Sequence, residues 1–176
     1  MSEPRARGVS LWLMPEGEVR DRLSARIASL SARLGTVPFP PHVTLLSGVE
    51  GLPDGEVRAL GRALAAGLRP LAVRLVDVEG RDEPFRCLFA RASADPPLVS
   101  AHAAAARAFG RAPDPAFFPH LSLVYGALGP EAKERLAAEL RSETAGAFEA
   151  PRLHAWRTEG PVRAWREIGS FDFPSG

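Results

Sequence analysis

Apolar residues recur along the chain in two alternating patterns, and their order predicts the secondary structure. The apolar run at 9–14, which ends at a proline, is typical of a strand. Over residues 17–34 the apolar positions recur every three or four residues, which predicts a helix with one buried face. Gly35 follows as a natural C-terminal stop. The chain therefore opens with a strand and a helix.

The same analysis of apolar spacing applies to the rest of the chain. It predicts that strands and helices alternate in the same order in both halves. The further elements that we expect before residue 81 are a strand at 42–47, a helix at 53–68 and a strand at 71–78. Those expected after it are strands at 85–92, 120–125, 148–157 and 162–173, and helices at 96–109 and 130–141. We predict a single α+β domain of duplicated β-α-β modules, with lobes at roughly 9–80 and 85–173 and frayed residues at 1–8.

One eight-residue pattern occurs in both halves. The first copy, residues 41–48, reads Pro-His-Val-Thr-Leu-Leu-Ser-Gly, and the second, residues 119–126, reads Pro-His-Leu-Ser-Leu-Val-Tyr-Gly. A proline-rich stretch precedes each copy. A single His-x-Ser/Thr tripeptide is a weak signal, but two copies with matching flanks are much harder to obtain by chance.

Alternation within each copy places the polar groups on one face. Side chains two apart on a strand share a face, so His42 and Thr44 point the same way, as do His120 and Ser122. If the two modules are related by an approximate two-fold axis, the two polar faces meet. We therefore expect a cleft that contains two imidazoles and two hydroxyls.

This set of groups suits the hydrolysis of a cyclic phosphate. Near neutral pH, one neutral histidine can take a proton from water while one charged histidine protonates the departing oxygen. The two hydroxyls can donate hydrogen bonds to the non-bridging oxygens, where negative charge gathers. The alternatives are histidines that merely begin strands, and a threonine that is present for its strand propensity.

The paired motifs resemble the signature of the two-histidine (2H) phosphoesterase superfamily. Segments 10–19, 35–45, 85–89 and 164–168 are also similar to the cyclic phosphodiesterases of plants and yeast, so the likeness spans nearly the whole chain. The resemblance implies two antiparallel-sheet lobes around a central cleft, with helices outside. It also implies opening of 2′,3′-cyclic nucleotides to 2′-phosphates, or of ADP-ribose 1″,2″-cyclic phosphate to ADP-ribose 1″-phosphate, without a metal or another cofactor.

Carried over position by position, the resemblance gives roles to seven residues. They are the catalytic pair His42 and His120, the phosphate-binding Thr44, Ser122 and Tyr125, and the base- or ribose-binding Trp12 and Phe85. Large aromatic side chains more often belong to a hydrophobic core. That is the alternative for Trp12 and Phe85, and it is the expectation for Trp156 and Trp165. His102 and His154 lie outside the motifs and are expected to be structural.

Composition narrows the class of protein. The 176 residues are 45% hydrophobic and 24% charged, with a net charge of +1, which is typical of a soluble globular protein and gives no overall field toward nucleic acid or membrane. Of the 22 basic residues all but Lys133 are arginine, which suits phosphate binding or reflects codon bias. Cys87 has no disulfide partner, and no signal or membrane-spanning segment is evident. We expect a cytoplasmic monomer that binds a nucleotide cyclic phosphate.

Two other functions stay open at this point. A 2′-5′ RNA ligase-like enzyme would act on RNA ends and would favour a basic groove, which the near-neutral charge does not suggest. A non-catalytic nucleotide or RNA sensor would not need both motifs intact. Other chemistries lack their residues, because the chain has no Gly-x-Ser-x-Gly or Walker loop and its four histidines are dispersed.

Overall fold

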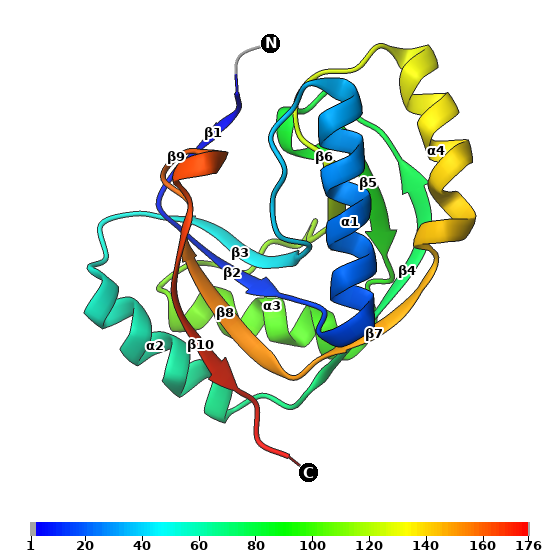
Figure 1. Cartoon of the computed structure of the whole chain (residues 1–176). Helices are drawn as coiled ribbons and strands as arrows, with labels where there is room; N and C mark the ends of the chain where they lie inside the picture. The colour runs from blue at the N-terminus through cyan, green and yellow to red at the C-terminus, as the bar shows by residue number, and fades with distance from the viewer. Residues whose placement is uncertain (1–2, 176) are drawn as a thin grey trace.

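The computed structural model describes residues 3–175, which form one curled sheet with helices packed on it (Figure 1). The strands of the large sheet are β2 (Val9–Leu13), β3 (Val43–Val49), β4 (Leu71–Glu79), β5 (Leu88–Ala92), β6 (His120–Val124), β7 (Gly146–Ala150), β8 (Arg152–Arg157) and β10 (Arg166–Asp172). A small separate pair consists of β1 (Arg5–Ala6) and β9 (Gly160–Pro161). The helices are α1 (Gly17–Leu34), α2 (Asp54–Ala66), α3 (Pro96–Ala108) and α4 (Pro130–Thr144).

The four predicted helices are confirmed, and local chemistry explains their ends. Helix α1 ends at Gly35, which has a left-handed φ of 66° and donates its N–H to the carbonyl of Ser31. Helices α3 and α4 begin with proline, where the missing N–H costs no helical hydrogen bond. The apolar stripe of α1 is buried at Leu23, Ile27 and Leu30. Among residues 3–175, no helix is long and apolar enough to cross a membrane.

Hydrogen bonding orders the large sheet as β10-β8-β2-β3-β6-β5-β4-β7, and all neighbouring strands are antiparallel. Strands β3 and β6, which carry the two histidine motifs, are neighbours at the centre of the sheet and pair at Val43 and Leu121. Helices α2 and α3 pack on the half that contains β3, and α1 and α4 pack on the half that contains β6 (Figure 1). The predicted α+β fold with antiparallel lobes is therefore confirmed.

The two halves of the sheet differ from the consecutive stretches 9–80 and 85–173. Strand β4 comes from the first stretch but pairs with β5 and β7, and β8 comes from the second but pairs with β2. The first helix of each repeat is exchanged as well, because α1 packs on β6 and α3 on β3. Only residues 80–87 join β4 to β5, and strands joined by a short connection tend to pair. Each half is therefore built from both repeats.

The stretch 148–157, which the sequence predicts as one strand, forms two. Strand β7 ends at Ala150 at one edge of the sheet, and β8 begins at Arg152 near the other edge. Pro151 lies between them and has no N–H with which to continue a ladder. Its carbonyl instead accepts a hydrogen bond from the N–H of Phe173 at 2.9 Å. The chain therefore passes from one half of the sheet to the other at this proline.

Three shorter predictions also need correction. Residues 85–87 are not part of a strand, because Pro84–Arg86 form a 3-10 turn before β5. The last strand begins at Arg166 and follows a second 3-10 turn, Val162–Ala164. Residues 5–6 of the segment expected to be frayed pair with β9, and residues 1–2 lie outside the described part of the chain.

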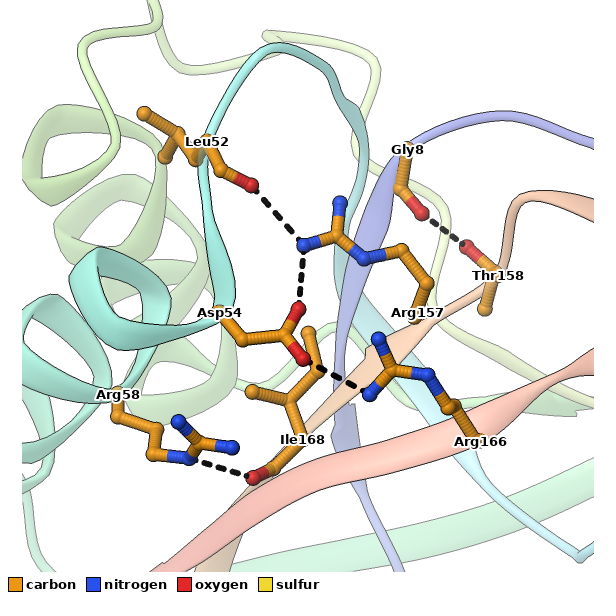
Figure 2. A network of polar contacts seen from close by, with 8 residues as sticks. All are labelled: Gly8, Leu52, Asp54, Arg58, Arg157, Thr158, Arg166 and Ile168. Atoms are coloured by element: carbon orange, nitrogen blue, oxygen red, sulfur yellow. Dashed lines mark hydrogen bonds and ion pairs between the residues drawn. The ribbon is translucent and has the colours of Figure 1, made fainter.

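An ionic cluster holds the start of α2 against β8 and β10 (Figure 2). Asp54 accepts a hydrogen bond from Arg157 at 2.6 Å and pairs with Arg166 at 2.8 Å. Arg157 also donates to the carbonyl of Leu52 at 2.9 Å. The hydrogen bonds from Arg166 and Arg157 lower the pKa of Asp54 to about 2. The cluster therefore prefers the ionised carboxylate.

We predict that the Asp54→Asn variant is less stable than the wild type at neutral pH and that the difference shrinks in acid. The folded-state pKa of Asp54 is depressed, so its contribution is present above the unfolded value near 4 and is lost as the pH falls toward 2. Urea unfolding at a series of pH values measures this. Asp21→Asn is the control, because among residues 3–175 the Asp21 carboxylate pairs with its neighbour Arg20 alone. A stability difference that is independent of pH would contradict the assignment.

Candidate active site

The pairing of β3 with β6 brings the polar groups of both motifs onto one face of the sheet. Val43 lies opposite Leu121. In an antiparallel pair with this register, His42 lies opposite Ser122, and Thr44 opposite His120, all on the other face from Val43 and Leu121. The two histidines are then diagonal neighbours, a relation in which the residues lie about 7 to 8 Å apart.

Each histidine is held in the same way by the backbone just before it. His42 Nδ1 lies 2.6 Å from the carbonyl oxygen of Pro40, and His120 Nδ1 lies 2.9 Å from that of Phe118. A carbonyl can only accept, so Nδ1 is the donor in both rings. Nε2 is then the nitrogen left for chemistry in both cases, and the proline-rich approach to each motif sets this tautomer.

His42 lies in a deeply buried aromatic environment. Its ring stacks on Trp12 with centroids 3.6 Å apart and an interplanar angle of 11°, and the residue is 4% exposed. Burial is the main reason that the pKa of His42 falls to about 3, with a smaller contribution from the charge of His120. The Tyr125 hydroxyl lies 3.4 Å from His42 Nε2. His42 is therefore neutral near pH 7, with a lone pair on Nε2.

His120 is more accessible and lies beside cations. Burial lowers its pKa, and the charges of Arg86 and Arg81 lower it further. Arg81 lies over the ring of Phe118, 4.3 Å from the centroid. Phe89 contacts the His120 ring edge to face, with centroids 5.2 Å apart. Phe89 pairs with Ser122 as Trp12 pairs with Thr44, so the two aromatics support the two histidines at equivalent positions.

The hydroxyls of Thr44 and Ser122, which the motifs place on the same face, differ in their hydrogen bonding. The Ser122 hydroxyl donates to the carbonyl of Phe85 at 2.8 Å, and the residue is 5% exposed. Thr44 is half-buried, and its side chain has no hydrogen-bond partner among residues 3–175. Thr44 is thus ready to donate to a ligand, whereas Ser122 must first rotate away from Phe85.

Aromatic side chains surround these groups. Tyr125 stacks on Phe39 at 3.7 Å and meets Phe85 edge to face at 5.1 Å. Burial raises the pKa of Tyr125 well above its ordinary value, so its hydroxyl keeps its proton. Trp165, which we expected in the core, is half-buried and lies 6.0 Å from Phe85. The 3-10 turns that the sequence did not predict carry Phe85 and precede Trp165.

All seven residues selected from the sequence line one pocket of about 630 Å³. Trp12 and Tyr125 contribute only narrow edges, because they are 1% and 5% exposed. Sequence reasoning missed Trp165 and His102, which also line the pocket. Trp165 is one tryptophan in a stretch predicted as a strand, and His102 is a single histidine in an alanine-rich helix, so the sequence gave no signal of either contact.

His102 holds the segment that leads into the second motif. On its β6 side, strand β3 is paired at Val43 only, so later carbonyls that face this side need other donors. His102 Nδ1 donates to the carbonyl of Leu45 at 2.7 Å, and its Nε2 accepts the N–H of Asp114 at 3.0 Å. Its ring stacks on Phe117 at 4.1 Å. A neutral His102 thus connects α3, β3 and the approach to His120.

We predict that His102→Leu lowers kcat about tenfold and the free energy of unfolding by about 2 kcal/mol, because two buried polar groups lose their partner. Thermal unfolding and steady-state kinetics measure the two effects. His154→Leu is the control, since the His154 side chain is partly exposed, does not line the pocket and pairs with Glu167 at its surface. A folded His102→Leu variant with unchanged kcat would show that this segment does not position His120.

The described residues contain no group of three or more histidine, cysteine, aspartate or glutamate side chains that could hold a metal ion. His154 and Cys87 lie outside the pocket, and Cys87 is buried. The polar groups that the two motifs bring to the site are therefore two imidazoles and three hydroxyls, with aromatic rings around them.

Comparison with known proteins connects this geometry to a family. The sequence pattern of the family described as "Cyclic phosphodiesterase-like protein" matches residues 7–173. A curated relative, the cyclic phosphodiesterase of Arabidopsis thaliana, is 25% identical over 134 residues, which cover 76% of this chain and 74% of the relative.

Solved structures have the same fold. The structure of TT0787 from Thermus thermophilus aligns with a TM-score of 0.63 and 21% identity over 96% of this chain and 98% of that one. E. coli LigT in complex with NADP+ aligns with a TM-score of 0.55 and 15% identity over 98% of this chain and 100% of that one. The family match over nearly the whole chain, together with the paired motifs on one face, shows that this protein is a phosphodiesterase of the cyclic phosphodiesterase-like family of 2H phosphoesterases.

Proposed function

We propose that the protein hydrolyses cyclic phosphodiesters of small nucleotides by acid–base catalysis between His42 and His120. The observation that carries the proposal is the pairing of β3 with β6, which puts both imidazoles on one face with Nδ1 held by carbonyls and Nε2 available. Preferred substrates are 2′,3′-cyclic nucleotides, opened to 2′-phosphates, and ADP-ribose 1″,2″-cyclic phosphate, opened to ADP-ribose 1″-phosphate.

The two histidines differ enough to receive different roles. His42 is the more buried and is neutral at pH 7, which suits the base that takes a proton from the attacking water at Nε2. The bond between phosphorus and the 3′ oxygen breaks, and His120 donates a proton from Nε2 to that oxygen. A bound phosphate anion raises the pKa of a nearby imidazole, which supports the charged form of His120 in the complex. Exchange of protons with solvent restores both rings.

Hydroxyl groups would hold the phosphate during this step. Thr44 lies opposite His120 and is free to donate to a non-bridging oxygen. Ser122 would donate after rotation away from Phe85, and Tyr125 keeps its proton and can donate to a water or to the phosphate. Phe85, Trp165 and the edge of Trp12 line the pocket where the base or ribose would lie.

The direct test is turnover by the purified protein. Phosphorus NMR or chromatography should show a 2′-phosphate as the product from each 2′,3′-cyclic nucleotide. We expect EDTA to leave the rate unchanged, since the side chains described above supply both proton transfers. Binding of the cyclic nucleotide without turnover would instead favour the non-catalytic sensor.

We further predict that kcat/KM falls as the pH rises through the neutral range. The acid must be charged, and the free enzyme's His120 has a pKa below 6.5, so above that pKa the active fraction falls about tenfold per pH unit. His42 has a pKa of about 3 and stays neutral above about pH 4, so no acid limb is expected at mildly acidic pH. Initial rates at low substrate from about pH 4.5 to 9 measure this, and an acid limb near pH 6.5 would contradict the role of His42.

A further inference from the structure

A pair of arginines lies in the same pocket, away from His42 and His120. Arg7 and Arg111 both line the pocket, and both are exposed. Within residues 3–175, neither guanidinium lies within ion-pairing distance of a carboxylate. Arg86, the other arginine of the pocket, differs because it pairs with Glu83 at 3.2 Å. Arg7 and Arg111 therefore differ from the many other arginines of the chain in two respects: they line the pocket, and they have no carboxylate partner among the described residues.

A helix terminus positions Arg111. Gly110 adopts a left-handed φ of 68° at the end of α3, and the N–H of Arg111 donates to the carbonyl of Ala106 at 2.8 Å. This closes the helix and directs the next residue toward β3. Arg111 Nη1 then donates to the carbonyl of Gly48 at 3.0 Å. One edge of the guanidinium is thereby held at the end of β3, and its other N–H groups have no protein acceptor among the described residues.

A close backbone contact positions Arg7 beside the same strand end. The next residue, Gly8, has a φ of 65°, and a Cβ there would lie 2.2 Å from the carbonyl oxygen of Val49. Only glycine allows this approach, which leads directly into the pairing of Val9 with Val49. The carbonyl of Gly8 also accepts the N–H of Thr158 at 2.9 Å. Both arginines are therefore presented by constrained backbone at the end of β3.

The distance along β3 separates this region from the catalytic groups. Thr44 and Gly48 are four residues apart, which corresponds to roughly 13 Å of strand. One phosphate therefore cannot contact both Thr44 and the Arg111 guanidinium at Gly48. The carboxylate of Asp114 also lines the pocket, and it accepts the N–H of Ala116 at 2.8 Å instead of pairing with Arg111. Among the residues that line the pocket at the end of β3, the two guanidinium groups therefore outnumber the one carboxylate.

We propose that Arg7 and Arg111 form a second anion subsite, which binds a further phosphate of a substrate whose cyclic phosphate lies at the histidines. The proposal rests on the proposed function and narrows its substrate class. A nucleoside 2′,3′-cyclic phosphate alone would fill only the catalytic end of the pocket. A dinucleotide with a cyclic 3′ end, or a cyclic nucleotide with a 5′-diphosphate, carries the additional phosphate that the subsite needs.

The test compares KM for three substrates with the same terminal base. The first is the nucleoside 2′,3′-cyclic phosphate, the second is a dinucleotide whose 3′ end is that cyclic phosphate, and the third is the same nucleoside 2′,3′-cyclic phosphate with a 5′-diphosphate. We expect the wild type to show a KM about tenfold lower for at least one extended substrate, and the Arg7→Ala/Arg111→Ala double variant to lose that advantage. KM for the mononucleoside substrate should not change. Added salt should reduce the advantage as well, because exposed charges are screened.

Arg69→Ala is the matched control, since Arg69 is exposed and lies outside the pocket. Equal KM values for all three substrates in the wild type would overturn the subsite while leaving the proposed function intact. If no substrate is turned over, the proposed function fails, and equilibrium binding of ADP then decides the subsite. Weaker ADP binding in the double variant but not in Arg69→Ala would support it, and equal binding would overturn it. A lower KM for the dinucleotide alone would indicate RNA ends as the substrate class.

Discussion

Replacing His42 or His120 by alanine is expected to lower kcat/KM for a 2′,3′-cyclic nucleotide by at least about a thousandfold in each variant. Each imidazole supplies one proton transfer of the same step, and the neighbouring hydroxyls have pKa values far too high to replace it. Since the two residues act together, the double variant should be little worse than either single one. Initial rates with saturating and limiting substrate measure the loss.

Two controls separate loss of chemistry from loss of structure. His154→Ala removes a histidine that pairs with Glu167 outside the pocket, and its rate should stay close to that of the wild type. His42→Gln and His120→Gln keep a polar side chain of similar reach and should be as inactive as the alanine variants, while circular dichroism shows that they fold. Near-normal turnover by either His42 variant would remove the basis of the proposed mechanism.

The sequence alone was sufficient for features that depend on local periodicity. Helical spacing gave α1 almost to the residue, and a C-terminal glycine marked its end. The strand period of two placed His42 with Thr44 and His120 with Ser122 on shared faces before any tertiary contact was known. These features depend on the backbone geometry of a few neighbouring residues, so they do not depend on tertiary contacts.

Features that depend on long-range pairing could not be obtained in this way. Nothing in the pattern around Pro151 shows that the flanking strands belong to different halves of the sheet. Likewise, the contacts of His102 with Leu45 and Asp114 arise because, on its β6 side, β3 has no paired strand beyond Val43. The approach of Trp165 to Phe85 depends on a 3-10 turn near each residue. Such contacts between residues far apart in the sequence are seen only in the three-dimensional structure.

The exchange of strands also connects the two halves of the sheet through the chain. The chain passes from the half that contains β3 to the half that contains β6 between β3 and β4, and it returns between β7 and β8. The pairing between β3 and β6 is itself short, with one pair of residues, Val43 and Leu121. The relative position of the two histidines therefore depends also on these chain crossings and on α1, which follows β2 in the sequence and packs on β6.

Trp12→Ala is expected to have the second-largest effect, because it acts on stability and on catalysis together. Trp12 is 1% exposed, so its loss should lower the free energy of unfolding by about 3 to 5 kcal/mol. Its ring also forms the surface on which His42 lies, 3.6 Å away. Without this surface His42 gains rotamer freedom and water, and we expect kcat to fall about a hundredfold. Denaturant unfolding and steady-state kinetics below the melting temperature measure the two effects.

Trp156 provides the comparison that separates these effects. It stacks on Trp12 at 4.6 Å but does not line the pocket, so Trp156→Ala should lower stability while kcat changes much less. Trp12→Phe keeps an aromatic face against His42 and should recover most of the lost kcat, although a smaller ring leaves a cavity. If Trp12→Ala folds and turns over substrate as well as Trp156→Ala does, then Trp12 has only a packing role, and the orientation of His42 depends on its contacts with the carbonyl of Pro40 and the hydroxyl of Tyr125.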